Sequence, residues 1–327
     1  MKNPLKNIRA TVEGDWAQYE RFLRKELRSD SPYVHSILNY VFANRGKGLR
    51  PLLVLLCSAL NREERPADQA TFIAAMMVEM IHTASLVHDD VVDEAYMRHN
   101  HPSVNALWRS RNAVLTGDFI LARCFSVGLG SGQVSIVTHI TRCIDLLSEG
   151  ELQQNCHSQT LSLSRQEYME IIYKKTASLL SACCTCGAMA AGADHDRQRA
   201  MKFYGDQLGL AFQIRDDILD YLPGPTGKPH LNDLRERKIT LPLLTVLETI
   251  PAARRHKLLR LLSDVRSTPS NAALIRDEVI AARGIEMAEA IMDEHLQQAC
   301  RALDPYPASP FIEALVELTR FVGARKD

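Results

Sequence analysis

Residues 79–105 have the sequence EMIHTASLVHDDVVDEAYMRHNHPSVN, and our interpretation of the chain starts from its acidic centre, Asp89, Asp90 and Asp93. From Phe72 onward, apolar side chains recur every three or four positions without Gly or Pro, which predicts a helix. Residues four apart share a helix face, so we expect Asp89 and Asp93 to point the same way, with Asp90 at the edge of that face. Because the preceding helix is apolar, we expect these carboxylates at the end of a packed bundle.

The spacing D-D-x-x-D occurs again in QIRDDILDY, residues 213–221, where it comprises Asp216, Asp217 and Asp220. At the Asp content of this chain, chance alone yields about 0.07 copies of the pattern. Carboxylates about 4 Å apart repel by roughly 4 kcal/mol at an effective dielectric of about 20. Hard divalent cations such as Mg²⁺ remove that cost, since they bind carboxylate oxygens and substrate phosphates. The alternative, an acidic helix end facing water, explains one copy better than two.

The net charge of the chain does not indicate a binding partner of opposite charge. The 327 residues are 46% apolar and carry 39 basic and 39 acidic side chains. Such a chain buries a large core, and a net charge of zero does not suggest a nucleic acid or a general membrane surface. The N-terminus has no apolar signal segment, and the longest clean apolar run, residues 51–60, is half a membrane span. We therefore expect a cytoplasmic protein without a transmembrane segment.

The eight cysteines include no C-x-x-C pair, which fits a reducing compartment. Cys183, Cys184 and Cys186 fall in an apolar helix rich in small residues. Buried thiols are therefore favoured over a zinc site.

Three basic residues, two well before the first acidic motif and one just after it, are suited to an anion. Lys47 and Arg50 flank the predicted start of a helix, where side-chain cations and the positive helix end together bind anions. An ordinary solvated turn is the alternative. Arg98 follows the first motif within two turns, and its guanidinium matches two phosphate oxygens at once.

Two further basic segments lie beyond the first motif. Lys175 and Thr176 interrupt an apolar helical pattern, where a lysine either needs an anionic partner or extends its amine to solvent. Lys228 and Lys238 belong to a Pro- and Gly-rich segment beside the second motif. This segment is suited to a lid that closes over a phosphate, and a solvated charged loop is the alternative.

Helical periodicity covers most of the chain, no strand pair with a hairpin turn signal stands out, and no solenoid repeat occurs. We therefore predict an all-α fold: a single large helical bundle around a deep central cavity, in one domain over residues 1–327. The predicted helices span residues 15–27, 34–42, 51–60, 69–93, 112–129, 134–157, 165–191, 196–220, 239–250, 252–262, 271–283, 286–301 and 310–321.

Two metal-ready acidic clusters, several cations and an apolar bundle together suggest one reaction. A diphosphate bridged to divalent ions by the six carboxylates becomes a leaving group, which ionises the attached carbon. The rest of the substrate is expected to be apolar, because Leu, Val, Ile, Met and Ala line the cavity. This combination predicts transfer of an allylic prenyl group.

The chain resembles trans-isoprenyl diphosphate (polyprenyl) synthases over nearly its whole length. Residues 88–93 match the first aspartate-rich motif of that family, and residues 204–220 match the longer second motif. Flanking elements also match, at Lys47, Arg50 and His82 and at residues 104–108, 117–119, 150–152, 175–177 and 227–242.

The resemblance implies a homodimer of the isoprenoid synthase type that condenses isopentenyl diphosphate with an allylic diphosphate, farnesyl or geranylgeranyl diphosphate. It implies three Mg²⁺ per active site, with Mn²⁺ as an alternative. By this resemblance the metals are held by Asp89, Asp90, Asp93, Asp216, Asp217 and Asp220, the allylic diphosphate by Arg98, Lys175, Thr176, Gln213, Lys228 and Lys238, and isopentenyl diphosphate by Lys47, Arg50, His82 and the position of His99. The catalytic group is expected to be Asp89, Asp90, Asp93, Lys175, Asp216 and Asp217.

Four residues depart from the family pattern. His99 replaces an arginine that helps hold isopentenyl diphosphate, and histidine at this position either weakens that site or makes it depend on pH. Gly48 ends the sequence Arg-Gly-Lys-Gly, where the family has Gly-Gly-Lys-Arg. Leu231 and Arg237 stand where glycine is common in the lid. Both metal motifs are intact.

Product length is expected to follow the size of residues just before the first motif. In short-chain relatives, bulky aromatics stand at the positions of Ala84 and Ser85, which are small here. We therefore expect a long all-trans product, roughly C30–C50, as used for quinone side chains.

Four alternatives remain open. They are a farnesyl or geranylgeranyl diphosphate synthase, a non-catalytic subunit of a heteromeric synthase, a prenyltransferase with another acceptor, and a terpene cyclase. The cyclase is disfavoured because its second metal motif is of the N-S-E type, whereas this chain repeats D-D-x-x-D.

Overall fold

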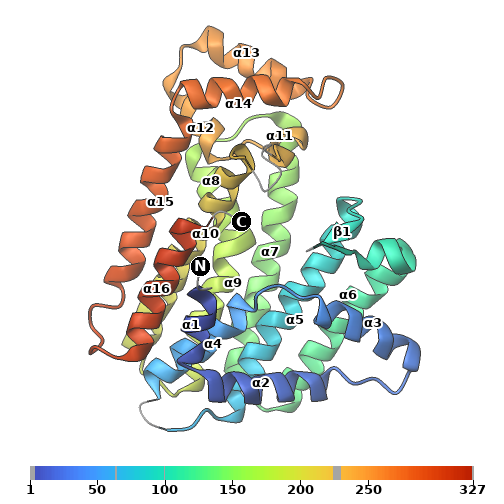
Figure 1. Cartoon of the computed structure of the whole chain (residues 1–327), viewed down its shortest axis with the longest axis vertical. Helices are drawn as coiled ribbons and strands as arrows, with labels where there is room; N and C mark the ends of the chain where they lie inside the picture. Colours follow the sequence, from blue (N-terminus) through green and yellow to red (C-terminus); the bar gives the residue numbers. More distant parts are fainter. Residues whose placement is uncertain (1–3, 63–64, 99, 224–229, 326–327) are drawn as a thin grey trace. The chain divides into compact units, whose positions relative to one another are not determined.

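The computed structural model describes residues 4–62, 65–98, 100–223 and 230–325. Its regular structure is almost entirely helical (Figure 1), which confirms the all-α prediction. His99 and Lys228 lie outside the described residues. The described chain forms two compact units. Unit 1 comprises Met1–Ile144, Ala182–Lys202 and Pro307–Leu315, and unit 2 comprises Asp145–Ser181, Phe203–Tyr306 and Val316–Asp327. The single domain over residues 1–327 stays a prediction.

Unit 1 is built around helix α5, Gln69–Val92, which packs against α4 and α6 (Figure 1). Asp68 caps its start by accepting a hydrogen bond from the backbone N–H of Thr71. The helix is apolar on nearly all sides, and Met76 and Met77 are fully buried, as expected of a core helix. The remaining helices that lie wholly in unit 1 are α1 Pro4–Ala10, α2 Glu13–Glu26, α3 Pro32–Ala43, α4 Leu49–Asn61 and α6 Val104–Gly130.

Helix α6 begins eight residues before its predicted start, because it contains a kink that the periodicity does not show. Arg109 has φ 68° and ψ 159°, a backbone conformation that glycine adopts readily and other residues rarely. Ser103 caps the first segment through the N–H of Ala106. Further along, Gly117 allows α6 to approach α5, since a Cβ at this position would lie 2.1 Å from Nε2 of His88.

Unit 1 also contains one small antiparallel strand pair, a minor exception to the helical structure. Strand β1, Met97–Arg98, pairs with β2, His101–Pro102, with Arg98 opposite His101. Strands of two residues are too short to show alternation between apolar and polar side chains, so no pattern of polarity indicates them. The hydroxyl of Tyr40 donates a hydrogen bond to the carbonyl of Pro102 at 2.6 Å and ties the pair to α3.

Unit 2 contains helix α8, Arg165–Ile172, the π-helical turn η1, Tyr173–Ala177, and the C-terminal helices. Ile214, Ile218, Leu244 and Ile275 lie in its buried core. Helix α12 packs along α15, and α13 lies beside α14 (Figure 1). The other helices that lie wholly in this unit are α11 Asn232–Arg235, α12 Leu241–Thr249, α13 Ala252–Ser263, α14 Asn271–Ala281 and α15 Gly284–Arg301. Four helices contribute residues to both units: α7 Val134–Thr160, α9 Ser178–Ala190, α10 His195–Tyr221 and α16 Pro310–Ala324.

Candidate active site

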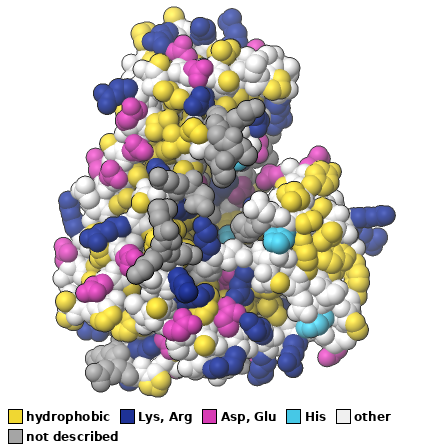
Figure 2. Space-filling model, viewed as in Figure 1, with side chains coloured by type: hydrophobic (Ala, Val, Ile, Leu, Met, Phe, Trp, Pro, Cys, Tyr) yellow, Lys and Arg dark blue, Asp and Glu magenta, His cyan; other side chains and the backbone are white. Residues whose placement is uncertain are grey.

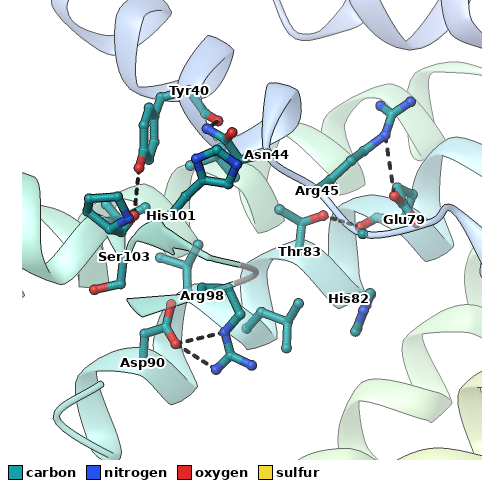
Figure 3. Close-up of a pocket in the computed structure, with 16 residues that line it drawn as sticks. Tyr40, Asn44, Arg45, Glu79, His82, Thr83, Asp90, Arg98, His101 and Ser103 are labelled. Atoms are coloured by element: carbon teal, nitrogen blue, oxygen red, sulfur yellow. Dashed lines mark hydrogen bonds and ion pairs between the residues drawn. The ribbon is translucent and has the colours of Figure 1, made fainter. Parts of the chain in front are cut away.

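The first aspartate motif lies at the C-terminal end of α5. Asp90 is only 3% exposed, whereas Asp93 is exposed and follows the last residue of the helix. Oδ1 of Asp90 accepts two hydrogen bonds from Arg98, at 2.9 Å from Nε and 2.6 Å from Nη2 (Figure 3). Asp90, expected at the edge of the face that Asp89 and Asp93 share, is therefore the buried carboxylate of this motif. Arg98, predicted to bind a phosphate, binds this carboxylate in the structure.

The strand pair fixes the position of Arg98. The N–H of Ala95 donates to the carbonyl of Asp90 at 2.9 Å, and the hydroxyl of Ser103 donates to the carbonyl of Ala95 at 2.7 Å. The first bond joins the segment before β1 to the end of α5, and the second joins the residue after β2 to that same segment. Local backbone structure therefore places Arg98 beside the first motif.

A cavity of about 60 Å³ within unit 1 is lined by three of the predicted site residues, His82, Asp90 and Arg98. Arg45 and Glu79 also line it, and they form an ion pair with 3.7 Å between Nε and Oε1 (Figure 3). The cavity therefore brings together cations, carboxylates and an imidazole. Such a mixture is suited to a phosphate and a metal ion bound next to each other.

Lys47 and Arg50 flank the start of α4, as predicted, although neither lines this cavity. Gly48 caps α4 with φ 68°, and a Cβ there would lie 2.7 Å from Cη2 of Trp16. Both facts explain why glycine, and not the arginine typical of the family, stands at this position. Burial raises the pKa of Glu79, and the guanidinium groups of Arg45 and Arg50 partly oppose this shift. Arg50 therefore acts on the charge state of a carboxylate that lines the cavity.

The two residues predicted to set product length lie on α5. Ala84 is fully buried, whereas Ser85 is half-buried and donates a hydrogen bond to the carbonyl of His82 at 2.9 Å. Their role in product length stays a prediction.

The second motif lies near the end of α10, and its middle carboxylate is held by a chain of hydrogen bonds. Asp217 is 3% exposed. The hydroxyl of Tyr168 donates to its Oδ2 at 2.6 Å, and Nε2 of Gln213 donates to its Oδ1 at 2.8 Å. The hydroxyl of Thr176 donates in turn to Oε1 of Gln213 at 2.6 Å. Burial raises the pKa of Asp217 to about 6, although the two hydrogen bonds lower it.

The π-helical turn η1 places Thr176 in this chain and directs the neighbouring lysines to α7. Nζ of Lys175 lies 2.8 Å from Oε1 of Glu151, and Nζ of Lys174 lies 3.1 Å from Oε1 of Glu149. Gly150 permits this close packing, because a Cβ there would lie 2.8 Å from Cβ of Lys174. The anionic partners expected for a lysine in this apolar stretch are thus glutamates of the chain itself. π-Helical turns are frequent at functional sites.

The outer carboxylates of the second motif are also bound within unit 2. Oδ1 of Asp216 accepts a hydrogen bond from Nη2 of Arg325 at 2.6 Å. Asp220 accepts the backbone N–H groups of Asn232 and Asp233, at 2.9 and 3.0 Å, and so holds the start of α11. The predicted phosphate ligand Lys238 forms an ion pair with Glu236.

The donor chemistry of both motifs fits a hard divalent cation, since all six predicted ligands supply carboxylate oxygens. Among the described residues, no three His, Cys, Asp or Glu side chains converge closely enough to hold a metal ion. Arg98 and Arg325 each bind a carboxylate that a cation would need. A metal ion therefore has to replace these guanidinium groups.

A family model described as Polyprenyl synthetase matches residues 31–279. The chain belongs to the polyprenyl synthetase family.

Relatives in this family match the present chain over nearly its whole length. It is 33% identical to the all-trans-nonaprenyl-diphosphate synthase (geranyl-diphosphate specific) of Rhodobacter capsulatus, over 96% of each chain. It is 31% identical to heptaprenyl diphosphate synthase component 2 of Bacillus subtilis, over 94% of this chain and 87% of that one. The crystal structure of a polyprenyl synthase from Caulobacter crescentus, complexed with calcium and isoprenyl diphosphate, has a TM-score of 0.90 and 32% identity, and the match covers 99% of this chain and 98% of that one.

Two residues whose side chains bind carboxylates of the second motif, Tyr168 and Arg325, were absent from our predicted set. Tyr168 precedes Lys175 by seven residues, two helical turns, so helical spacing offered a weak signal for it. Arg325 is separated from Asp216 by 109 positions. No local pattern links residues so far apart.

Two helices of the described part are long and apolar enough to cross a membrane, α5 and α6. The apolar stretch of α5 is 83% buried, which is typical of the core helix of a folded unit. That of α6 is 33% buried. Length and composition alone establish no membrane span.

Proposed function

We propose that this polyprenyl synthetase is a Mg²⁺-dependent prenyltransferase that condenses isopentenyl diphosphate with farnesyl or geranylgeranyl diphosphate. The observation that carries the proposal is the hydrogen-bond chain from Thr176 through Gln213 to Asp217 and Tyr168. These hydrogen bonds orient both oxygens of the Asp217 carboxylate. The hydroxyl of Thr176 belongs to the same chain of bonds, and Thr176 lies in the turn η1, which also carries Lys174 and Lys175. Relatives named as polyprenyl diphosphate synthases support the same activity.

In this reaction the chain has to bind two diphosphates and keep water away from an allylic cation. Asp89, Asp90, Asp93, Asp216, Asp217 and Asp220 would hold three Mg²⁺, and Mn²⁺ is an alternative. Bound divalent ions would neutralise the allylic diphosphate as a leaving group. Arg98, Lys175 and Thr176 would bind its oxygens, together with Gln213, Lys238 and Lys228. Lys47, Arg50 and His82 would bind isopentenyl diphosphate.

We further propose that the product is long, roughly C30–C50, because small side chains at Ala84 and Ser85 leave room for a growing apolar tail. The relative named as a nonaprenyl diphosphate synthase supports this length. The test is to incubate the purified chain with farnesyl diphosphate, labelled isopentenyl diphosphate and Mg²⁺, and to measure the masses of the products. Products no longer than geranylgeranyl diphosphate would contradict the proposed length, and absence of turnover by the chain alone would contradict catalysis by a homomeric enzyme.

A second candidate is a subunit of a heteromeric synthase. It is favoured by the relative named as component 2 and by His99 at a position where the family has arginine. Turnover that requires a second protein would support this candidate, and turnover by the purified chain excludes it.

We propose that the homomeric enzyme is a dimer that pairs through α6. Val114, Leu115 and Leu129 share one face of this helix and are 41%, 55% and 61% exposed. Apolar faces of this kind mark protein interfaces. Replacing Leu115 and Leu129 with Glu should halve the mass measured by light scattering. Leu274→Glu, at an exposed leucine of α14, is the control that should leave the mass unchanged.

We propose a cytoplasmic location. All eight cysteines are free thiols in the structure, as expected in a reducing compartment.

A further inference from the structure

A groove of about 700 Å³ lies between α2 and α3 in unit 1. Of the residues proposed for the reaction, Lys47 alone is among the described residues that line it. Trp16 and Leu23 of α2, with Leu27 directly after this helix, form one wall, and His35 and Phe42 of α3 form the other. The loop from Arg45 to Gly48 closes one end. This volume is in the range of small-molecule sites. The apolar side chains of the two walls, Trp16, Leu23, Leu27 and Phe42, together form the apolar floor of the groove.

The rim of the groove is strongly basic. Arg24 and Arg28 line it together with Arg9, Arg45 and Lys47, whereas Glu20 is the one acidic side chain among the described residues that line it. Glu20 is itself bound by Arg45 and lies 3.7 Å from Arg24. Figure 2 shows Lys and Arg side chains gathered over α2 in the lower part of the view. The chain as a whole has no net charge, so the basic rim is a local excess of positive charge. Such an excess attracts anions.

Two details indicate a ligand with oxygen atoms and an apolar or aromatic part. Nδ1 of His35 is buried and has no hydrogen-bond partner in the described part of the chain. A buried polar atom without a partner is costly, and because His35 lines the groove, rotation of its ring toward a bound ligand would give this atom a hydrogen-bond partner. The guanidinium of Arg9 lies 5.2 Å from the ring centre of Trp16, so a cation and an aromatic face already meet in the groove.

We propose that this groove binds an organic phosphate or diphosphate, with its phosphate oxygens on Arg24, Arg28 and His35 and its apolar part over Trp16 and Leu27. Arginines arranged around an apolar floor favour such a ligand over a free inorganic ion, because the floor adds contact with the organic part. The ligand also meets the loop that carries Lys47. Occupation of the groove should therefore change the KM for isopentenyl diphosphate, and this consequence alone rests on the proposed function.

The binding experiment uses the full chain in EDTA, so that carboxylate-bound metal does not recruit the probe. Inorganic diphosphate and farnesyl monophosphate are titrated separately, by calorimetry and by the fluorescence of Trp16, one of two tryptophans. We expect both probes to bind and farnesyl monophosphate to bind at least about tenfold more tightly. Equal affinity for the two probes would overturn the role of the apolar floor, and absence of binding by both would overturn the site.

The chain offers a matched control for charge. The double variant Arg24→Glu/Arg28→Glu should weaken binding of both probes at least about tenfold. Arg21→Glu/Lys25→Glu makes the same change of charge on exposed positions that do not line the groove, and should leave binding within about twofold. Equal losses in both double variants would show general attraction and overturn the site. Turnover of isopentenyl diphosphate by Arg24→Glu/Arg28→Glu, measured without added ligand, tests the proposed function separately.

Discussion

Nη2 of Arg325 donates a hydrogen bond to Oδ1 of Asp216 at 2.6 Å. The guanidinium also lies 4.5 Å from the ring centre of Phe212, and the carbonyl of Arg325 accepts a hydrogen bond from Nε of Arg215 at 2.8 Å. A residue close to the C-terminus is thus held at three points on α10. It neutralises the first carboxylate of the second aspartate motif, where a divalent cation is expected.

Replacing Arg325 with Ala should strengthen metal binding, because Mg²⁺ no longer competes with a guanidinium for Asp216. We expect the Mg²⁺ concentration for half-maximal activity to fall about fivefold, the equivalent of roughly 1 kcal/mol for a partly exposed pair. Arg320→Ala, at an exposed position of α16, the helix that ends just before Arg325, is the control and should leave this concentration unchanged. A higher Mg²⁺ requirement in Arg325→Ala would contradict competition.

Replacing Tyr168 with Phe should weaken metal binding, since it removes the hydrogen bond that orients Oδ2 of Asp217. Groups that orient a metal ligand typically contribute about 10- to 100-fold to metal affinity. Calorimetric titration with Mn²⁺ in the presence of inorganic diphosphate measures the effect without turnover. Tyr204→Phe is the matched control, because this tyrosine is also fully buried in unit 2 but its hydroxyl lies 3.2 Å from Oγ1 of Thr319. Equal losses in both variants would show a general packing effect.

Replacing Asp217 with Asn should abolish activity and yet stabilise the metal-free protein at neutral pH. Burial raises the pKa of Asp217 from 3.8 to about 6, so the folded state holds this proton more tightly than the unfolded state. The free energy of unfolding therefore falls as pH rises from about 4 to about 6, and the loss is complete above that range. Thermal unfolding in EDTA should show a larger gain for Asp217→Asn at pH 7.5 than at pH 4.5. A gain independent of pH would refute this account.

Replacing Arg109 with Gly should stabilise the protein, because arginine has to adopt φ 68° and ψ 159° at the kink of α6. Strain of this kind costs about 1–3 kcal/mol, and the flexibility of glycine in the unfolded chain offsets part of the gain. We expect a net increase of about 1 kcal/mol in the free energy of unfolding in urea. Arg111→Gly, two residues further along the same helix, should instead destabilise by about 1 kcal/mol. Loss of stability in Arg109→Gly would exclude strain.

Replacing Ser85 with Phe should shorten the product, because an aromatic ring there would block the growing tail. Ser85 is half-buried and accommodates a larger side chain, whereas Ala84 is fully buried and Ala84→Phe should cost about 1–3 kcal/mol of stability through overpacking. Product masses from farnesyl diphosphate and isopentenyl diphosphate measure the length. An unchanged product in Ser85→Phe would remove this residue from the predicted wall.

Helices and acidic motifs were predictable where the signal lies within a few turns of chain. The spacing around Phe72–Asp93 predicted α5 with its acidic end. The π-helical turn at Tyr173–Ala177 was not predicted, since the pattern indicated one continuous helix over residues 165–191. The kink at Arg109 was not predictable, because its cause is a backbone conformation and not a pattern of polarity. The unusual lid residues Leu231 and Arg237 gained a physical meaning only in the structure, where they have φ 52° and 66°.

The sequence by itself determined the helical class, the two trios of aspartates and the kind of ligand that hard oxygen donors select. Only the tertiary structure decided which donor meets each carboxylate: Arg98 for Asp90, Tyr168 for Asp217 and Arg325 for Asp216. The physical reason is the range of the two signals. Helical periodicity is local and repeats every few residues, whereas the contacts of Asp217 with Tyr168 and of Asp216 with Arg325 join positions 49 and 109 residues apart through the packing of helices.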